Sequence, residues 1–364
     1  MINKSRTRLT AAGFLLLGVL LCGLVIRLAD ASLTAAGARR LPCADAEYVW
    51  VNSDQIITFS TTEAIYKKKV GRGYSDDVVK ATMDAERTDI KSGSRISLIE
   101  FDKLFPAETP GDFQRWSVSP NGTRLLFSDK TSDQDYYHPG APQTVWTFDT
   151  GLAIRVDPDV YAGISYSCDY ALWTPNNGLL ILESHDGALK TALYNMEARD
   201  DSTVAVAVEG SARTPIGMTP DGRLVSSDYA AEHATGITIF VQGVWNSQAP
   251  LSKHVPALPS GALVKEIALS PNGSRLAWTV SRTYASPIYR YIKKFAPKLA
   301  AKFAPKPVVS VYVSSLDCKM MRLLGMEENP PNVPAEEVRS VRWRPDGKSI
   351  SYRWRHGIYM VQVN

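Results

Sequence analysis

A short stretch of the chain gathers side chains that could recognise a ligand. It contains two carboxylates, two phenol rings and an imidazole, namely Asp133, Asp135, Tyr136, Tyr137 and His138. Aromatic rings can stack on a sugar or peptide while the carboxylates and the imidazole form hydrogen bonds with it. The same residue types also fill ordinary exposed turns. The sequence therefore leaves a ligand-binding loop and a plain surface loop open.

Residue types used in metal binding and covalent catalysis do not fall at productive spacings. No two histidines are four residues apart and no Cys-x-x-Cys occurs, so we expect no zinc site and no cofactor. The string at 163–167, Gly-Ile-Ser-Tyr-Ser, ends in serine where a hydrolase nucleophile elbow needs glycine. Catalysis would need carboxylates that converge from separate parts of the fold.

A second candidate site is defined by charge. The segment 282–306 contains seven basic residues and no acidic one. The candidates for contact with a partner or a membrane surface are Arg290, Lys293, Lys294, Lys298, Lys302 and Lys306. Apolar residues recur among them at helical spacing, and Pro297 would divide the segment into two short helices.

Three roles are open for this basic segment. It could lie on an anionic membrane surface, dock an acidic partner, or pack as a solvated helix across the edge of a sheet. Nucleic acid is not an expected partner, because the rest of the folded region carries more acidic than basic residues.

These candidates must be positioned by a repeated element. Five segments share an apolar lead-in, then Ser, Thr or Arg followed by Pro, then Asn or Asp, and then an alternating apolar run; their prolines are Pro120, Pro175, Pro220, Pro271 and Pro345. Proline sets φ near −65° at the first corner of a tight turn, and the glycine that follows supplies a positive φ. Alternating apolar residues on both sides predict β-hairpins with one buried face.

The repeats predict an all-β fold. A degenerate sixth copy spans Tyr48–Ser60, and the copies recur about every 45 to 75 residues. We predict a six-bladed β-propeller over 44–364, with seven blades left open and with insertions at about 61–97 and 282–306. We interpret the first insertion as a surface excursion, in which Asp76–Glu86 could form a short helix.

The phrases Ser-Pro-Asn-Gly and Arg-Pro-Asp-Gly, each followed by an alternating strand, resemble the TolB-type, WD-like β-propeller repeat of exported bacterial proteins. The resemblance implies a propeller that serves as an interaction platform, a periplasmic assembly factor or the gating domain of a larger peptidase. The peptidase role is not expected, because a hydrolase domain of roughly 200 residues would have to accompany the propeller.

The N-terminal region predicts a membrane segment. A basic flank, 1–8, precedes the apolar run 9–26, whose eighteen residues would form a helix about 27 Å long. We expect a single-pass anchor in a bacterial inner membrane, a linker at 27–43, and a propeller in the periplasm or outside the cell. The alternatives are a secreted protein after signal cleavage near Ala29-Asp30-Ala31 and a lipoprotein modified at Cys22.

The folded region contains three cysteines, Cys43, Cys168 and Cys318. At most one disulfide can form among them, and buried unpaired thiols are the alternative.

Two functions follow from these observations. The favoured hypothesis is a non-enzymatic, membrane-anchored extracytoplasmic propeller that binds another protein or an envelope component. The alternative is a propeller-type enzyme that acts on a glycan or lactone at the channel mouth. A lipid-surface sensor that uses 282–306 is a third possibility.

Overall fold

The fold is described from a computed structural model. The structure describes residues 32–34, 36–70, 73–98, 115–130, 143–149, 170–185, 188–195, 200–202, 214–228, 236–243, 251–284, 287–300, 305–328 and 338–363.

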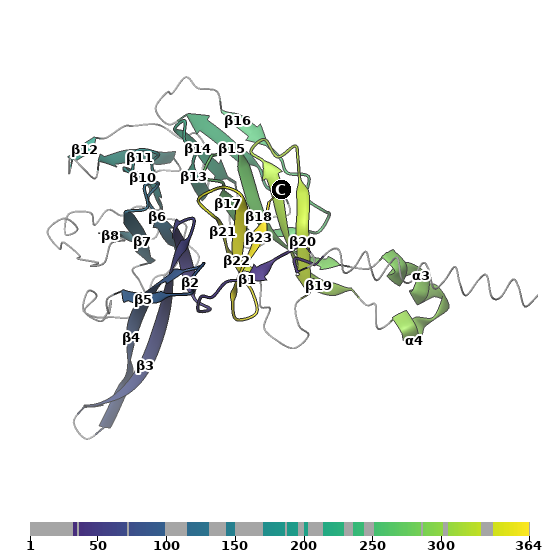
Figure 1. The fold of residues 1–364 in the computed structure, drawn as a ribbon, viewed down its shortest axis with the longest axis horizontal. Helices are drawn as coiled ribbons and strands as arrows, with labels where there is room; N and C mark the ends of the chain where they lie inside the picture. Colours follow the sequence, from purple (N-terminus) through teal and green to yellow (C-terminus); the bar gives the residue numbers. More distant parts are fainter. Residues whose placement is uncertain are drawn as a thin grey trace, which may run out of the picture.

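The described strands form six antiparallel sheets (Figure 1). The first contains β2 (Glu47–Asn52), β3 (Gln55–Val70), β4 (Gly73–Asp89) and β5 (Arg95–Leu98). The second contains β6 (Arg115–Val118), β7 (Arg124–Lys130) and β8 (Gln143–Asp149). The third contains β9 (Tyr170–Trp173), β10 (Leu179–His185), β11 (Ala188–Asn195) and β12 (Asp200–Ser202).

The fourth sheet contains β13 (Thr214–Met218), β14 (Arg223–Ser227), β15 (Ile239–Gly243) and β16 (Ser252–His254). The fifth contains β17 (Leu263–Leu269), β18 (Arg275–Tyr284), β19 (Lys306–Ser315) and β20 (Arg322–Glu328). The sixth contains β21 (Arg339–Trp343), β22 (Ser349–Arg353), β23 (Ile358–Gln362) and β1 (Arg39–Arg40).

Each Pro-containing turn joins the first two strands of a sheet, as the repeats predicted. At the β6–β7 turn the N–H of Gly122, whose φ is 74°, donates to the Ser119 carbonyl over 2.8 Å. The β9–β10 turn has Asn177 at this position with a φ of 61°. Asparagine tolerates the left-handed region better than most residues, so this copy keeps the turn without the glycine.

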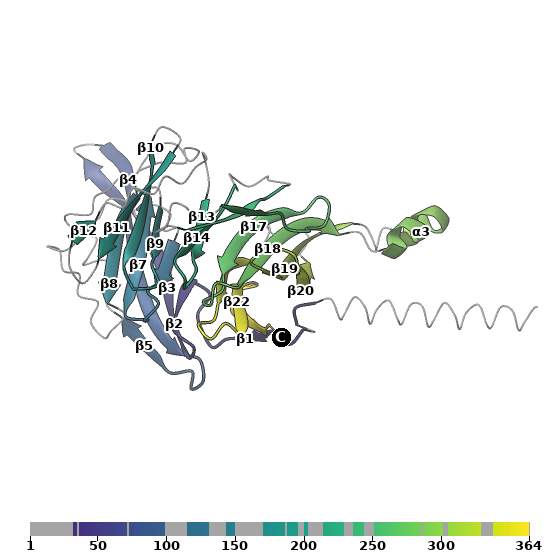
Figure 2. The ribbon, with the colours of Figure 1, turned by 90° about the horizontal axis from the view of Figure 1, so that it is seen from above.

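The sheets are arranged as a β-propeller, which confirms the predicted fold class (Figures 1 and 2). The first strand of one sheet contacts the first strand of the next in the series β9, β13, β17, β21, β2 and β6. Large apolar side chains are buried between neighbouring sheets. Trp278 is fully buried between the fourth and fifth sheets, and Tyr352 is fully buried in the cluster that joins the fifth and sixth.

The sixth sheet is completed by the N-terminal part of the propeller. β1 pairs with β23 in the register Arg39 to Met360, and Leu33 is fully buried in the core cluster of the last two sheets. Part of the segment expected to be a linker, 27–43, therefore belongs to the folded region. A two-residue strand has no periodic pattern in the sequence, so only its distant pairing partner identifies it.

The helix predicted at Asp76–Glu86 is wrong, because these residues lie in β4. β3 and β4 form one long hairpin with pairs such as Ile56 to Thr88 and Thr62 to Thr82. The first sheet thus continues through 61–97 with β4 and β5, and the hairpin extends beyond the other sheets (Figure 1). Pairing with β3 outweighs the weak local preference for helix.

The basic segment forms two short helices, α3 (Pro287–Phe295) and α4 (Pro297–Ala300), as Pro297 predicted. They lie between β18 and β19 of the fifth sheet and project away from the sheets in both views (Figures 1 and 2). Among the described elements, α3 and α4 pack mainly on each other. We call residues 287–300 the arm.

Two earlier expectations concern cysteines and the membrane. Cys43 and Cys318 are buried free thiols, whereas Cys168 lies outside the described residues.

The segment 9–26, which was predicted to span a membrane, also lies outside the described residues. No helix in the part of the chain that the structure describes is long and apolar enough to cross a membrane.

Candidate functional site

The arm contains four of the six basic residues that the sequence proposed as a binding surface. Arg290, Lys293 and Lys294 lie on α3, and Lys298 lies on α4. Lys306 is the first residue of β19, and Lys302 lies outside the described residues. The ligand-loop candidates at 133–138 also lie outside them, so that loop stays a prediction.

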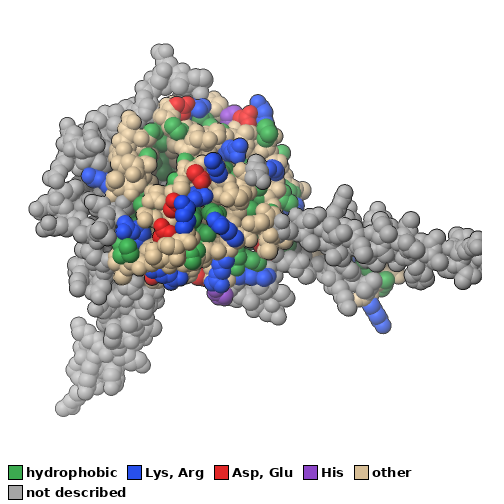
Figure 3. Space-filling model, viewed as in Figure 1, with side chains coloured by type: hydrophobic (Ala, Val, Ile, Leu, Met, Phe, Trp, Pro, Cys, Tyr) green, Lys and Arg blue, Asp and Glu red, His purple; other side chains and the backbone are tan. Residues whose placement is uncertain are grey.

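The described side chains of the arm combine positive charge with an exposed ring. Lys293, Lys294 and Lys298 are exposed, and Phe295 is 77% exposed. Lys294 Nζ lies 5.7 Å from the centre of the Phe295 ring. In Figure 3 one basic side chain projects from the arm at the right of the view, whereas basic and acidic side chains are intermixed on the visible face of the body. Among the described residues, no carboxylate forms an ion pair with these three lysines.

The arm is rooted beside the N-terminal segment of the propeller. Tyr284 pairs with Lys306 at the base of the arm, and the same strand, β19, pairs with β20. On the other side of β20, Ser32 forms a parallel bridge with Met326. Gly325 permits this approach, because a Cβ there would lie 2.8 Å from the Leu33 nitrogen.

A buried carboxylate holds this junction. The backbone N–H groups of Leu33 and Thr34 donate hydrogen bonds to Glu327 of β20. Burial raises the pKa of Glu327, while the positive charge of Arg355 and these two hydrogen bonds oppose the shift. The chain that leads to residues 1–31 is thus fixed to the sheet that carries the arm.

A polar cluster that the sequence analysis missed links three first strands, β17, β21 and β2. Glu266 of β17 accepts hydrogen bonds from the backbone N–H groups of Ser340 and Val341 on β21, over 2.9 and 2.7 Å. Glu47 of β2 accepts one from the Ser340 hydroxyl over 2.7 Å. Ser340 has a φ of 53°, in a region that a non-glycine residue rarely adopts. The two carboxylates therefore hold an unfavourable backbone conformation where the ring of sheets closes.

The repeat alignment contains a signal for this cluster. Trp50, Leu269 and Trp343 are equivalent, because each ends the lead-in and pairs with the first apolar residue after the turn. Three residues before them stand Glu47, Glu266 and Ser340. The repeats on either side of the sixth sheet thus both have glutamate at the position where the sixth has Ser340. This shared position would have indicated a contact of both glutamates with Ser340 if the place where the ring closes had been known.

Further polar contacts join the sixth sheet to the first. Arg353 of β22 forms ion pairs with Glu47 over 2.5 Å and with Asp45 over 3.2 Å. Inside the interface, Tyr48 donates to the Ser340 carbonyl over 2.8 Å, and Ser351 Oγ lies 2.8 Å from Tyr48 Oη.

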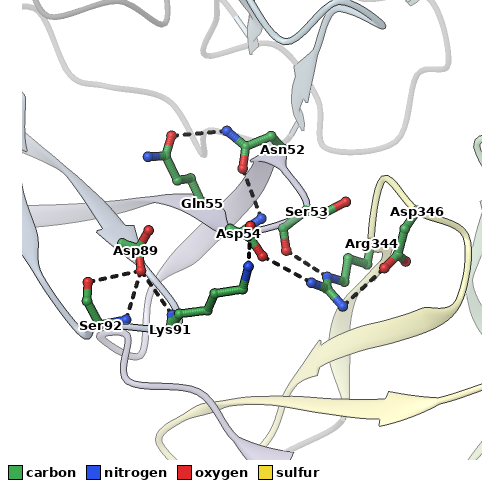
Figure 4. A network of polar contacts seen from close by, with 9 residues as sticks. All are labelled: Asn52, Ser53, Asp54, Gln55, Asp89, Lys91, Ser92, Arg344 and Asp346. Carbon is green, nitrogen blue, oxygen red and sulfur yellow. Dashed lines mark hydrogen bonds and ion pairs between the residues drawn. The ribbon is translucent and has the colours of Figure 1, made fainter.

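The opposite ends of these strands carry a second network (Figure 4). Arg344 occupies the position that is Ser or Thr in the other four turns. Its Nε donates to the Ser53 carbonyl over 2.7 Å, and its terminal nitrogens form ion pairs with Asp54 and Asp346 over 3.3 and 3.1 Å. Lys91 also pairs with Asp54, over 2.7 Å. Both ends of the junction are thus held by charged groups.

These clusters join the sheets where the ring closes, whereas Lys293, Lys294, Lys298 and Phe295 of the arm are exposed. The exposed lysines suit phosphate or carboxylate groups, and Phe295 provides an apolar contact beside them. No group of three or more His, Cys, Asp or Glu side chains suited to a metal ion occurs within the described ranges.

Comparisons with known proteins find similar solved structures alone. No protein-family model and no curated protein match the chain. TolB from Acinetobacter baumannii is 12% identical, with a TM-score of 0.41, and the match covers 76% of this chain and 53% of that one. The chain thus spans about half the length of that TolB structure.

Two further solved structures are similar. The C-terminal WD40 domain of Sif2 is 10% identical, with a TM-score of 0.40 and coverage of 90% of this chain and 98% of that one. An oligogalacturonate lyase from Vibrio parahaemolyticus is 10% identical, with a TM-score of 0.39 and coverage of 78% and 74%. TolB and WD40 propellers, which the repeat resembles, are both among the similar structures. The sheet topology itself carries the fold assignment.

Proposed function

We propose that this protein is a non-enzymatic scaffold, a six-bladed β-propeller held at the outer side of a bacterial inner membrane by the apolar segment 9–26. There it binds another protein or an envelope component. The observation that carries the proposal is the junction at β20, where Ser32, Leu33 and Thr34 are fixed to the fifth sheet. Only five residues, 27–31, separate Ile26 from Ser32, so an anchor at 9–26 would hold this sheet next to the bilayer.

The scaffold role is supported by two extensions that leave the ring of sheets, the β3–β4 hairpin and the arm (Figure 1). Each sheet of a propeller packs against the neighbouring sheets. Extensions beyond the ring therefore provide surface that a partner can contact. The arm combines exposed charge with an exposed ring, a composition that is typical of contact surfaces.

A crosslinking pull-down from native membranes tests the proposal. The full chain is compared with a variant in which an Asn-Gly turn replaces 285–305, a replacement chosen because Tyr284 pairs with Lys306 and a two-residue turn can close that hairpin. We expect specific envelope proteins with the full chain. Loss of these proteins in the variant assigns them to the arm, whereas retention assigns them to the propeller body. Capture no better than an unrelated membrane protein would refute the scaffold role.

Membrane attachment is tested separately by alkaline extraction and by protease access from the outer side. We expect the full chain to resist extraction and to be digested from the periplasmic side only. Release of a shortened chain into the soluble fraction would support cleavage and a secreted protein instead.

The enzymatic alternative has one observation in its favour. Glu47 and Glu266, from different sheets, approach the same residue, Ser340, at one end of the first strands. Carboxylates that converge from separate sheets could act on a glycan or lactone. Glu266, however, bonds to backbone N–H groups with both oxygens, which favours the structural role. Hydrolysis or elimination that is abolished by Glu47→Gln without a change in melting temperature would establish the alternative.

A further inference from the structure

We infer that the arm binds the anionic headgroups of the same membrane in which the chain is anchored. The inference rests on the proposed anchor at 9–26 and adds a second, electrostatic contact with lipid. It assigns Lys293, Lys294, Lys298 and Phe295 to a membrane-surface site.

The charge of the arm suits an anionic surface. Neither α3 nor α4 contains an acidic residue, and three of their lysines are exposed without an ion-pair partner among the described residues. A lysine near an anionic lipid surface strengthens binding by about fivefold. Three such lysines together would strengthen it roughly a hundredfold.

The apolar part of the arm suits the boundary between headgroups and acyl chains. Phe295 ends α3 and is 77% exposed, while Tyr289 and Ile292 are half-buried. Amphipathic helices of this composition lie in the plane of a membrane, with their rings among the headgroups and their lysines toward phosphate.

The position of the arm suits the membrane as well. Ser32 pairs with β20, the outer strand of the fifth sheet, and the base of the arm at Lys306 is in the adjacent strand β19; Met326 bridges Ser32 and pairs with Ser310, four residues from Lys306. With strands about 4.8 Å apart and about 3.3 Å per residue, Ser32 lies within about 20 Å of Lys306. The six residue-to-residue steps from Ile26 to Ser32 can span about 20 Å at most.

These lengths bring the arm to the bilayer. A nine-residue helix is about 14 Å long, so α3 can reach the surface from a sheet edge that the anchor holds nearby. A soluble acidic partner would satisfy the lysines but would not need the anchor and the arm to leave the same sheet. The shared origin of the two segments favours lipid.

The test uses the full chain with a photo-crosslinking residue, p-benzoylphenylalanine, in place of Phe295. The matched control carries the same residue in place of Met320, which is 76% exposed and lies between β19 and β20, at the opposite end of the same sheet. Both proteins are reconstituted in vesicles of phosphatidylcholine alone or with 30% phosphatidylglycerol. Flotation reports insertion of the anchor, and mass spectrometry of the irradiated protein reports lipid adducts.

We expect lipid adducts at position 295 to exceed those at position 320 at least fivefold in the vesicles with phosphatidylglycerol. The triple variant Lys293→Glu, Lys294→Glu and Lys298→Glu should lose this excess, and the triple Lys→Arg variant should keep it. Equal adducts at the two positions, or equal adducts with and without phosphatidylglycerol, would overturn the inference. The inference would also be overturned if crosslinking in native membranes gave adducts with protein in place of adducts with lipid.

The anchor and the arm fail in different ways. A chain that floats with neutral vesicles but gives no excess at position 295 has the anchor and refutes the arm site. A chain that does not insert refutes the anchor. The arm is then tested by mixing the protein with vesicles that have already formed. Adducts at position 295 that require phosphatidylglycerol would still support the arm site, and their absence would refute it.

Discussion

The hydroxyl of Ser351 is predicted to stabilise the junction between the last and first sheets. Ser351 is fully buried, and its Oγ lies 2.8 Å from both Tyr48 Oη and Trp50 Nε1. In Ser351→Ala the Trp50 N–H would lose its acceptor in a place that water does not reach. An unsatisfied buried donor costs about 1–3 kcal/mol.

This free energy translates into a measurable shift in melting temperature. The folded region is roughly 330 residues long, and unfolding entropy is about 2 cal/mol/K per residue. A loss of 1–3 kcal/mol should therefore lower the melting temperature by about 1.5–4 °C. The full chain is melted in mild detergent and followed by tryptophan fluorescence, to which Trp50 itself contributes.

Ser310→Ala is the matched control. Ser310 is also fully buried in a strand, but its Oγ has no hydrogen-bond partner among the described residues. Its removal relieves a buried unsatisfied hydroxyl, so the melting temperature should stay the same or rise. The reasoning is refuted if Ser351→Ala melts within 0.5 °C of the parent, or if both variants lose equally.

Three further predictions concern the turns, the N-terminal junction and the thiols. Gly347→Ala should lower the free energy of unfolding by about 1–2 kcal/mol because φ is +67°. Gly273→Ala should lower the free energy of unfolding by about 1–3 kcal/mol more than Gly347→Ala does, because the added Cβ would also lie 2.8 Å from the neighbouring turn. The raised pKa of Glu327 means that the folded chain binds this proton more tightly than the unfolded chain. The stability that the protonated Glu327 contributes is present below its ordinary pKa of 4.5 and is lost as pH rises through the raised value. Glutamine does not titrate. The melting temperature of Glu327→Gln minus that of the parent should therefore increase between pH 4 and pH 7. Burial raises the pKa of Cys43 to about 11 and that of Cys318 to about 12. Iodoacetamide at pH 8 should therefore label the folded chain more slowly than the unfolded chain, roughly a hundredfold at Cys43 and roughly a thousandfold at Cys318.

Each of these three has an outcome that contradicts it. Equal losses for the two glycine variants in urea unfolding would mean that the turns do not pack against each other. A difference between Glu327→Gln and the parent that is constant with pH would show that the carboxyl is not perturbed. Peptide mass spectrometry that finds both cysteines labelled in the native chain within the same time as in urea would show that they are accessible.

The hairpins could be predicted from the sequence because their information is local. Proline, asparagine or aspartate, and glycine within four residues determine the turn, and alternating residues on either side determine the buried face. The turn at Gly222, with a φ of 80°, is one example. The two arm helices were predicted for the same reason, since Pro297 acts on its own neighbours.

The extent of the first sheet and its junction with the last could not be predicted in this way. The sequence predicts a helix in part of β4, because nothing within Asp76–Glu86 indicates its pairing partners in β3, which lie about 10 to 28 residues away. The contacts of Ser340 with Glu47 and Glu266 join residues that are 293 and 74 apart in the chain. Their residue types have meaning only after the sheets have closed into a ring.

The sequence by itself therefore determined the repeated hairpin, the propeller class and the basic, acid-free character of the arm. These depend on turn chemistry, periodicity and charge, which act over a few residues. Only the tertiary structure decided that β1 completes the last sheet, that two carboxylates hold Ser340, and that the arm begins beside the fixed N-terminal segment. These depend on which distant strands become neighbours, and that choice follows from closing the ring so that no sheet is left with an open inner edge.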